Sequence, residues 1–177
     1  KEMLKDCSLS VRKGEILGVG GLTGQGQDEL FRALYGVQAA SGQVALDGER
    51  IQVKSPSEAL KAGIALVPED RATQGLLFPK SVADNITLSV LNQILRFGFI
   101  NRRAERGVVR SAMERFSIMV PDPADPVERL SGGNQQKVVL AKLLATQPDV
   151  LMMFDSTRGV DVGTKAEIYR SEERRVG

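Results

Sequence analysis

The chain has 177 residues, of which 42% are hydrophobic and 26% charged, a balance typical of one globular domain. It contains no histidine and a single cysteine, Cys7, which excludes catalysis by histidine, a zinc site of cysteine and histidine, and an internal disulfide. The net charge of +2 gives no overall attraction to nucleic acid, and no apolar run approaches the length of a membrane-spanning helix. We expect Cys7 to pack as a small hydrophobic residue.

Strand and helix patterns alternate in the first part of the chain. The apolar run at 15–20 predicts a buried strand, and the apolar positions of 28–35 share one helical face. An Asp-Gly pair within 43–51 predicts a β-hairpin, and a Ser-Pro pair opens a predicted helix at 55–61. The run 64–67 predicts a second buried strand.

The second part of the chain is predicted to be mostly helical. The pattern is helical from 82 to 116, with a basic interruption at 102–103, and three prolines make 120–126 a loop. A helix resumes over 133–144, and 150–154 predicts a strand. The alternation implies an α/β fold with a largely parallel sheet, an antiparallel β segment and an inserted helical subdomain.

A glycine-rich loop at 21–28 lies between a predicted strand and a predicted helix, where a phosphate-binding loop is expected. Its glycine spacing lets backbone N–H groups close around phosphate oxygens. Gln27 stands where such loops carry a lysine, and Asp28 where they carry a hydroxyl that holds Mg²⁺, so an ordinary strand-to-helix turn is the alternative. The predicted phosphate contacts are Gly21, Thr23, Gly24, Gln25, Gly26, Gln27 and Asp28.

A second anion site is predicted at 130–137 (LSGGNQQK), which opens a helix. Ser131 can cap this helix, while Gly132 and Gly133 remove Cβ atoms from the approach to its free N–H groups. The positive end of the helix dipole favours an anion at this point. A capped amphipathic helix without a ligand is the alternative for this motif alone.

The ordered motifs resemble those of the ATP-binding cassette (ABC) family over roughly residues 4 to 169. The segment 67–71 (VPEDR) falls where that family has its Q-loop, with Glu69 at the glutamine position. The segment 157–163 (TRGVDVG) matches the D-loop, with Asp161 as its aspartate. The wording of these motifs is similar to that of the second, C-terminal cassette of fused importers for simple sugars such as ribose or galactose.

The resemblance implies a P-loop NTPase fold with a RecA-like core at 1–79 and 127–169 and a helical signature subdomain at 80–126. In the family, two cassettes pack head to tail, and each ATP lies between the phosphate loop of one and the signature of the other. This implies ATP and Mg²⁺ as cofactors. The implied residues are Ser131, Gly132, Gly133, Gln135 and Asp161 for the nucleotide, Asp28 and Glu69 for the metal, and Asp155 and Glu69 for catalysis.

The resemblance also implies partners and a location. We expect a second cassette in the same full-length polypeptide, transmembrane permease subunits that meet 82–115, an indirect contact with a solute-binding protein, and no nucleic acid. The cassette would lie at the cytoplasmic face of the cell membrane. We expect the chain to be a fragment and 170–177 (RSEERRVG) to be a non-native tail resembling translated adapter sequence, or otherwise a solvated helix end.

The chain departs from the family at the end of its last predicted strand. A gap-free alignment from 130 to 161 puts Phe154 at the Walker B aspartate and Asp155 at the catalytic glutamate. A one-residue shift would instead make Asp155 the Walker B residue. In the gap-free register Phe154 cannot support a metal and Asp155 is one methylene short, so we expect this chain's own site to be weak or silent.

Two questions stay open at the level of sequence. Asp28 could ligate Mg²⁺ directly, or it could only favour the start of its helix. The chain could be the ATPase domain of a sugar importer, or a non-hydrolytic regulatory or structural cassette that only completes a partner's ATP site. An RNA-associated cassette would require basic extensions, which a net charge of +2 argues against.

Overall fold

Two apolar runs form a parallel strand pair at the centre of the chain's computed structural model, which describes residues 4–22 and 24–155. β3 (Ile64–Val67) pairs with β6 (Val150–Met153) in the register Ile64↔Val150 to Val67↔Met153. Strands covered on both faces are expected to be apolar throughout, as these two are. The pair confirms the two predicted strands and the parallel arrangement.

The other elements precede, separate or connect these strands. In chain order they are α1 (Gln27–Leu34), β1 (Val44–Leu46), β2 (Glu49–Ile51), α2 (Pro56–Lys61), the turn η1 (Arg71–Gly75), α3 (Val82–Thr87), η2 (Leu88–Val90), α4 (Leu91–Ile94), β4 (Leu95–Arg96), β5 (Phe99–Ile100), α5 (Arg102–Phe116), η3 (Val127–Arg129) and α6 (Gly132–Leu144).

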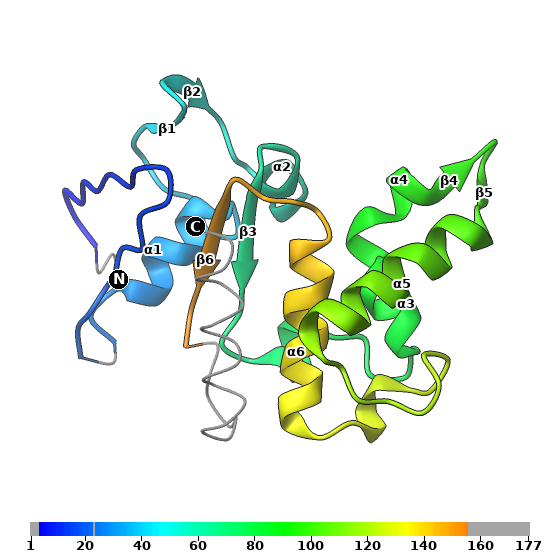
Figure 1. Ribbon diagram of the computed structural model, residues 1–177. Helices are drawn as coiled ribbons and strands as arrows, with labels where there is room; N and C mark the ends of the chain where they lie inside the picture. Colours follow the sequence, from blue (N-terminus) through cyan, green and yellow to red (C-terminus); the bar gives the residue numbers. More distant parts are fainter. Residues whose placement is uncertain (1–3, 23, 156–177) are drawn as a thin grey trace.

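Helix α6 lies between the strand pair and a group of helices formed by α3, α4 and α5 (Figure 1). Its side chains belong to one core that also contains Val67 of β3, Ile86 of α3 and Val109 of α5, all of them buried. A smaller core on the other side of the strands joins Met152 to the apolar face of α1. The α6 helix therefore links the strand part of the molecule to its helical part.

Local capping explains where several helices begin. Ser55 accepts a hydrogen bond from the Glu58 amide at the start of α2, and Ser81 accepts one from the Asp84 amide at the start of α3. The Asn101 side chain accepts hydrogen bonds from the first turn of α5. Such side chains satisfy amides that have no partner within the helix.

Most predicted elements are confirmed with small changes in their bounds. The antiparallel pair β1 and β2 turns at Asp47 and Gly48, both with positive φ, as the Asp-Gly signal predicts. The predicted helices at 28–35, 55–61 and 133–144 correspond to α1, α2 and α6.

Two local predictions in the first part of the chain are wrong. The segment 15–20 is not a strand, and Ile16 within it is 73% exposed. Cys7 is also exposed instead of packed. An apolar run becomes a strand only where another strand accepts its hydrogen bonds, and no described strand pairs with this one.

The interruption predicted within 82–116 is also in the wrong place. Its basic residues Arg102 and Arg103 begin α5, and the break is the hairpin of β4 and β5. The preceding helix ends at Ile94, because Leu95 is extended, and the chain then turns at Phe97 and Gly98, which both have positive φ.

No helix within 4–22 and 24–155 is long and apolar enough to cross a bilayer. The division into a core at 1–79 and 127–169 and a subdomain at 80–126 stays a prediction, and the predicted tail at 170–177 lies outside the described residues.

Candidate nucleotide site

The glycine loop leads directly into α1, as predicted. Gly26 is the N-cap of α1 with φ of 107°, and Gly24 has φ of 83°, so both adopt the left-handed conformation that favours glycine. A Cβ on Gly26 would come within 2.8 Å of the Leu4 side chain. No side chain caps α1, so the amides of its first turn are available to an anion.

Two glutamines of the loop bind the loop itself. Gln25 Oε1 accepts a hydrogen bond from the Leu22 amide at 3.0 Å, and Gln27 Nε2 donates one to the Leu22 carbonyl at 3.3 Å. Gln27 therefore folds back along the loop, and it carries no positive charge for a phosphate.

Asp28 is engaged by a residue that the sequence analysis did not single out. Arg32 Nε donates to Asp28 Oδ1 at 2.7 Å. The side chain of Arg32 is 44% exposed and that of Asp28 is 42% exposed. This hydrogen bond and the charge of Asp28 raise the pKa of Arg32, and the charge of Glu69 adds a smaller contribution. The (i, i+4) spacing of Asp28 and Arg32 on a helix was the available signal.

The end of β6 presents an aromatic ring to α1. The Phe154 amide donates to the Val67 carbonyl at 3.0 Å, which extends the parallel pairing by one residue. The Phe154 ring packs against Phe31 of α1, with ring centroids 5.7 Å apart. Asp155, the next residue, is exposed and has a φ of 40°.

These residues do not fit a resident Mg²⁺ beside the glycine loop. Asp28 is bonded to Arg32, and the strand end that faces α1 carries a phenylalanine. Over 4–22 and 24–155, no three carboxylate, cysteine or histidine side chains gather closely enough to hold a metal ion. Ligation of Mg²⁺ by Asp28 and Glu69 stays a prediction that this geometry does not support.

The signature segment forms the predicted capped helix start. Ser131 Oγ accepts hydrogen bonds from the Asn134 amide at 3.4 Å and from its side-chain Nδ2 at 3.2 Å. Asn134 Oδ1 in turn accepts one from the Met119 amide at 3.0 Å. Ser131 is exposed, and Gly132 and Gly133, the first two residues of α6, have amides that no helical carbonyl can reach.

Gln135 is buried inside the protein. Its Oε1 accepts a hydrogen bond from Arg71 Nε at 3.1 Å, and its Nε2 donates to the Leu130 carbonyl at 3.1 Å. The side chain therefore ties α6 to η1, the turn that follows Glu69. Its predicted contact with nucleotide stays a prediction.

A second contact ties α6 to the far end of the same turn. Lys142 Nζ donates to the Gly75 carbonyl at 3.0 Å, and burial lowers the pKa of Lys142. Glycine at position 75 lets the turn lie close to α6, because a Cβ at this position would crowd the Val139 side chain at 3.0 Å. Gln135 and Lys142 are seven residues apart, so they lie two turns apart on one face of α6.

Asp70 caps the start of the turn. It accepts hydrogen bonds from the Ala72 amide at 2.9 Å and from Thr73 Oγ1 at 2.8 Å. These bonds, led by that of the Thr73 hydroxyl, lower the pKa of the Asp70 carboxyl. Thr23 and Asp161, two other predicted contacts of the nucleotide, lie outside the described residues.

The chain matches known proteins over most of its length. The sequence model of the ABC transporter family matches residues 4–158. The chain is 46% identical over 172 residues to the xylose import ATP-binding protein XylG of Burkholderia cenocepacia. It is 48% identical over 173 residues to the ribose import ATP-binding protein RbsA 2 of Rubrobacter xylanophilus. These matches cover 96% and 97% of this chain but only 33% of each relative, so the chain spans about a third of their length.

Solved structures share the fold. CbiO1 of Clostridium perfringens, part of an ABC transporter complex, matches 98% of this chain and 67% of its own with 26% identity and a TM-score of 0.76. A dimeric ATP-binding cassette bound to ADP and Pi matches 98% of this chain and 75% of its own with 20% identity and a TM-score of 0.80. The fold is therefore that of an ABC ATPase, with a P-loop NTPase architecture. The chain belongs to the ABC transporter family.

Proposed function

We propose that this chain is an ATP-binding cassette of a simple-sugar importer and occupies the second, C-terminal position of a longer polypeptide. The proposal is supported by identities of 46% and 48% to proteins named for xylose and ribose import. Its partners would be another cassette, permease subunits and, through these, a solute-binding protein. The cassette would work at the cytoplasmic face of the membrane without binding nucleic acid.

The start of α6 is the observation that carries the proposal. Ser131 caps the helix and stays exposed, and Gly132 and Gly133 leave their amides accessible to an incoming anion. A partner cassette that carries ATP would place its γ-phosphate against these donors. The hydrogen bonds and the helix dipole would then stabilise the triphosphate across the dimer interface.

This chain's own phosphate loop would contribute less. Gln27 supplies no charge, and a charge-assisted contact of the missing lysine is worth about 1.5–3 kcal/mol. Nucleotide binding at this loop is therefore expected to be weaker by about 10- to 100-fold than with a lysine. Catalytic roles for Asp155 and Glu69 belong to this weak site.

The side chains of β6 support the gap-free register. Val150 and Met152 pack in the core on the α1 side, and the Phe154 ring continues on that side against Phe31. A Walker B aspartate has to face the start of the P-loop helix, and Phe154 is the residue on that face. Asp155 would then stand at the position of the catalytic glutamate.

The alternative is a cassette that never hydrolyses nucleotide at its own site. The contact of Asp28 with Arg32 and the folded-back Gln27 favour it, because both turn the polar groups of the loop toward the protein. In this reading the chain contributes only its α6 start to a partner's site.

The test compares ATP turnover of the chain alone with turnover of the chain paired with an intact cassette. We expect turnover only in the pair and its loss in Ser131→Arg, because the long side chain fills the space of the γ-phosphate. Ser57→Arg, an exposed substitution in α2, is the matched control and should leave turnover unchanged. Equal turnover of the Ser131 variant and the unmodified pair would refute the proposal.

Turnover also separates the two functions. If mutation of the partner's phosphate loop abolishes all hydrolysis while this chain's loop is intact, the chain is a non-hydrolytic cassette. If a residual rate persists and is lost in Asp155→Asn, the chain's own site hydrolyses ATP. Circular dichroism of each variant establishes that the fold is retained.

A further inference from the structure

The β4–β5 hairpin exposes an aromatic tip at one end of the molecule. Phe97 is 88% exposed and Phe99 79%, and Leu95 and Ile100 of the same hairpin are 42% and 39% exposed. The hairpin extends beyond α4 and α5, at the opposite side of the molecule from the β1–β2 hairpin (Figure 1). We call residues 95–100 the aromatic tip.

Turn chemistry does not explain these aromatic residues. Phe97 and Gly98 both have positive φ, at 52° and 82°, and a two-residue turn of this kind favours Asn, Asp or Gly. The β1–β2 hairpin makes the same kind of turn with Asp47 and Gly48. Core packing does not explain the aromatic residues either, because both rings are exposed.

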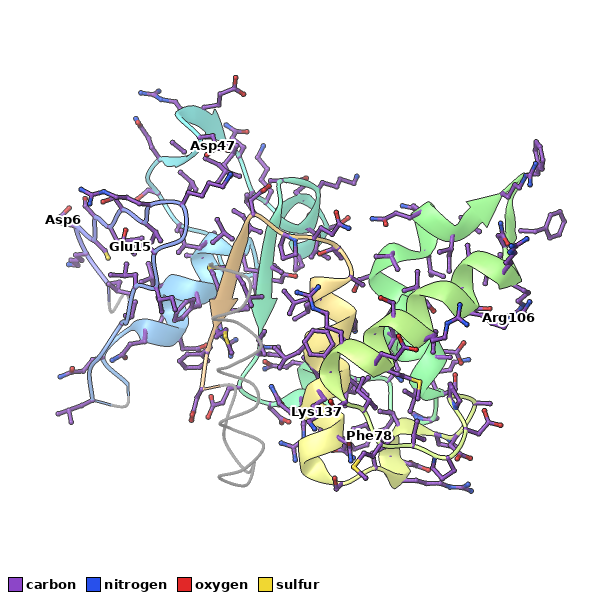
Figure 2. The ribbon with its side chains drawn as sticks, in the orientation of Figure 1. Asp6, Glu15, Asp47, Phe78, Arg106 and Lys137 are labelled. Carbon is purple, nitrogen blue, oxygen red and sulfur yellow. The ribbon has the colours of Figure 1, made fainter. Side chains whose placement is uncertain are left out.

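An arginine face on α5 adjoins the aromatic tip. We use this name for Arg102, Arg103, Arg106 and Arg110, all of which are exposed. Arg102, Arg106 and Arg110 recur every four residues and so lie along one side of the helix. Figure 2 shows Arg106 on α5 near the hairpin, far from Asp47 on the other hairpin.

The charge of this region is strongly positive. Arg102 donates to Glu105 at 2.8 Å, and this carboxylate balances its charge. The hydrogen bond to Glu105 and, to a smaller extent, the charge of Asp84 raise the pKa of Arg102. Among the described residues, no ion pair joins a carboxylate to any of the other three or to Arg96. The Arg96 guanidinium lies over the Phe97 ring, 5.4 Å from its centroid.

We propose that the aromatic tip and the arginine face dock directly on the surface of a bilayer that contains anionic lipids. Aromatic rings insert at the level of the headgroups, while guanidinium groups remain near lipid phosphates. Basic residues close to an anionic surface add to the attraction and make it sensitive to salt.

The shape and the charge favour a lipid surface over a protein partner. A bilayer accepts a convex apolar tip without a complementary pocket. Its anionic phosphates also match a face that carries an excess of arginine.

The test measures flotation of the purified chain with vesicles in the absence of nucleotide, so it does not depend on the proposed ATP chemistry. We expect binding to vesicles of phosphatidylcholine and phosphatidylglycerol, weaker binding at high salt, and little binding to phosphatidylcholine alone. Phe97→Asn with Phe99→Thr should weaken partitioning about tenfold or more, because two exposed rings are lost. Asn suits the turn better than Phe, so this variant should keep the hairpin.

Charge variants and matched controls complete the test. Arg103→Gln with Arg106→Gln should also weaken binding to the anionic vesicles. Met119→Thr, which removes another side chain that is 77% exposed, and Arg50→Gln on the β1–β2 hairpin should leave it unchanged.

Two results would overturn the proposal. One is a chain that stays in solution with both kinds of vesicle, and the other is a Phe97→Asn, Phe99→Thr variant that floats as well as the unmodified chain. If that variant instead loses capture by permease subunits while vesicle binding is absent throughout, the tip contacts protein and lipid docking is rejected.

Discussion

At the scale of single residues, Arg32 decides what the Asp28 carboxylate contacts. The hydrogen bond of 2.7 Å from Arg32 Nε occupies one carboxylate oxygen of Asp28, Oδ1. Two readings of Asp28 were open from the sequence, direct ligation of Mg²⁺ and a favourable charge at a helix start. Asp28 lies in the first turn of α1, as the second reading requires, and its contact with Arg32 does not favour a metal ligand.

We predict that Asp28→Thr binds ATP more tightly in the presence of Mg²⁺, by about tenfold. The substitution removes a negative charge near the phosphates, releases Arg32 and supplies a hydroxyl group. Titration with a fluorescent ATP analogue, with and without Mg²⁺, measures the change. Glu29→Gln, one residue further along α1, is the control for a general loss of negative charge, and weaker Mg²⁺-dependent binding in Asp28→Thr would identify Asp28 as a metal ligand.

At the scale of elements, α6 is hydrogen-bonded to both ends of the turn η1. Gln135 bonds to Arg71 and Lys142 to Gly75, and the same helix begins at Ser131. A displacement of the turn that follows Glu69 would therefore move the start of α6 with it. The neighbouring glutamines Gln135 and Gln136 differ in their hydrogen bonds, so substitutions of the two can be compared directly.

We predict that Gln135→Leu lowers the free energy of unfolding by about 1–3 kcal/mol, whereas Gln136→Leu lowers it by less than about 0.5 kcal/mol or raises it. Gln135 bonds to Arg71 and Leu130, but the buried Gln136 Nε2 has no partner among the described residues. Urea unfolding measures both, and hydrogen exchange should rise in η1 only for Gln135→Leu. Equal losses for the two variants would contradict this account.

At the scale of the whole molecule, one core connects the strand pair to the helices. Val67 of β3 and Val109 of α5 contact the same cluster through α6, in which Leu140 is 1% exposed. A continuous core favours cooperative unfolding, because loosening either part exposes the apolar surface of the other.

We predict that Leu140→Ala lowers the free energy of unfolding by about 3–4 kcal/mol and leaves a single transition. The cavity would lie in the core shared by both parts, so the amides of β3 and α5 should lose protection against hydrogen exchange together. Leu88→Ala is the control and should cost less than about 1 kcal/mol, because Leu88 is 39% exposed. Retained protection of β3 with loss in α5 would show that the two parts unfold separately.

The sequence by itself determined the features that depend on near neighbours. The Asp47-Gly48 turn, the caps at Ser55 and Ser131, and the apolar runs of β3 and β6 all follow from residues within a few positions of one another. The motifs also indicated the family, because their order and spacing along the chain are local properties.

Only the tertiary structure decided which groups distant segments bring together. The apolar run 15–20 is exposed because no described strand pairs with it, and Gln135 is buried because Arg71, 64 residues away, meets it. The aromatic tip is likewise exposed because no described element covers the hairpin. Burial and long-range hydrogen bonds depend on how elements pack, and no pattern within one element contains that information.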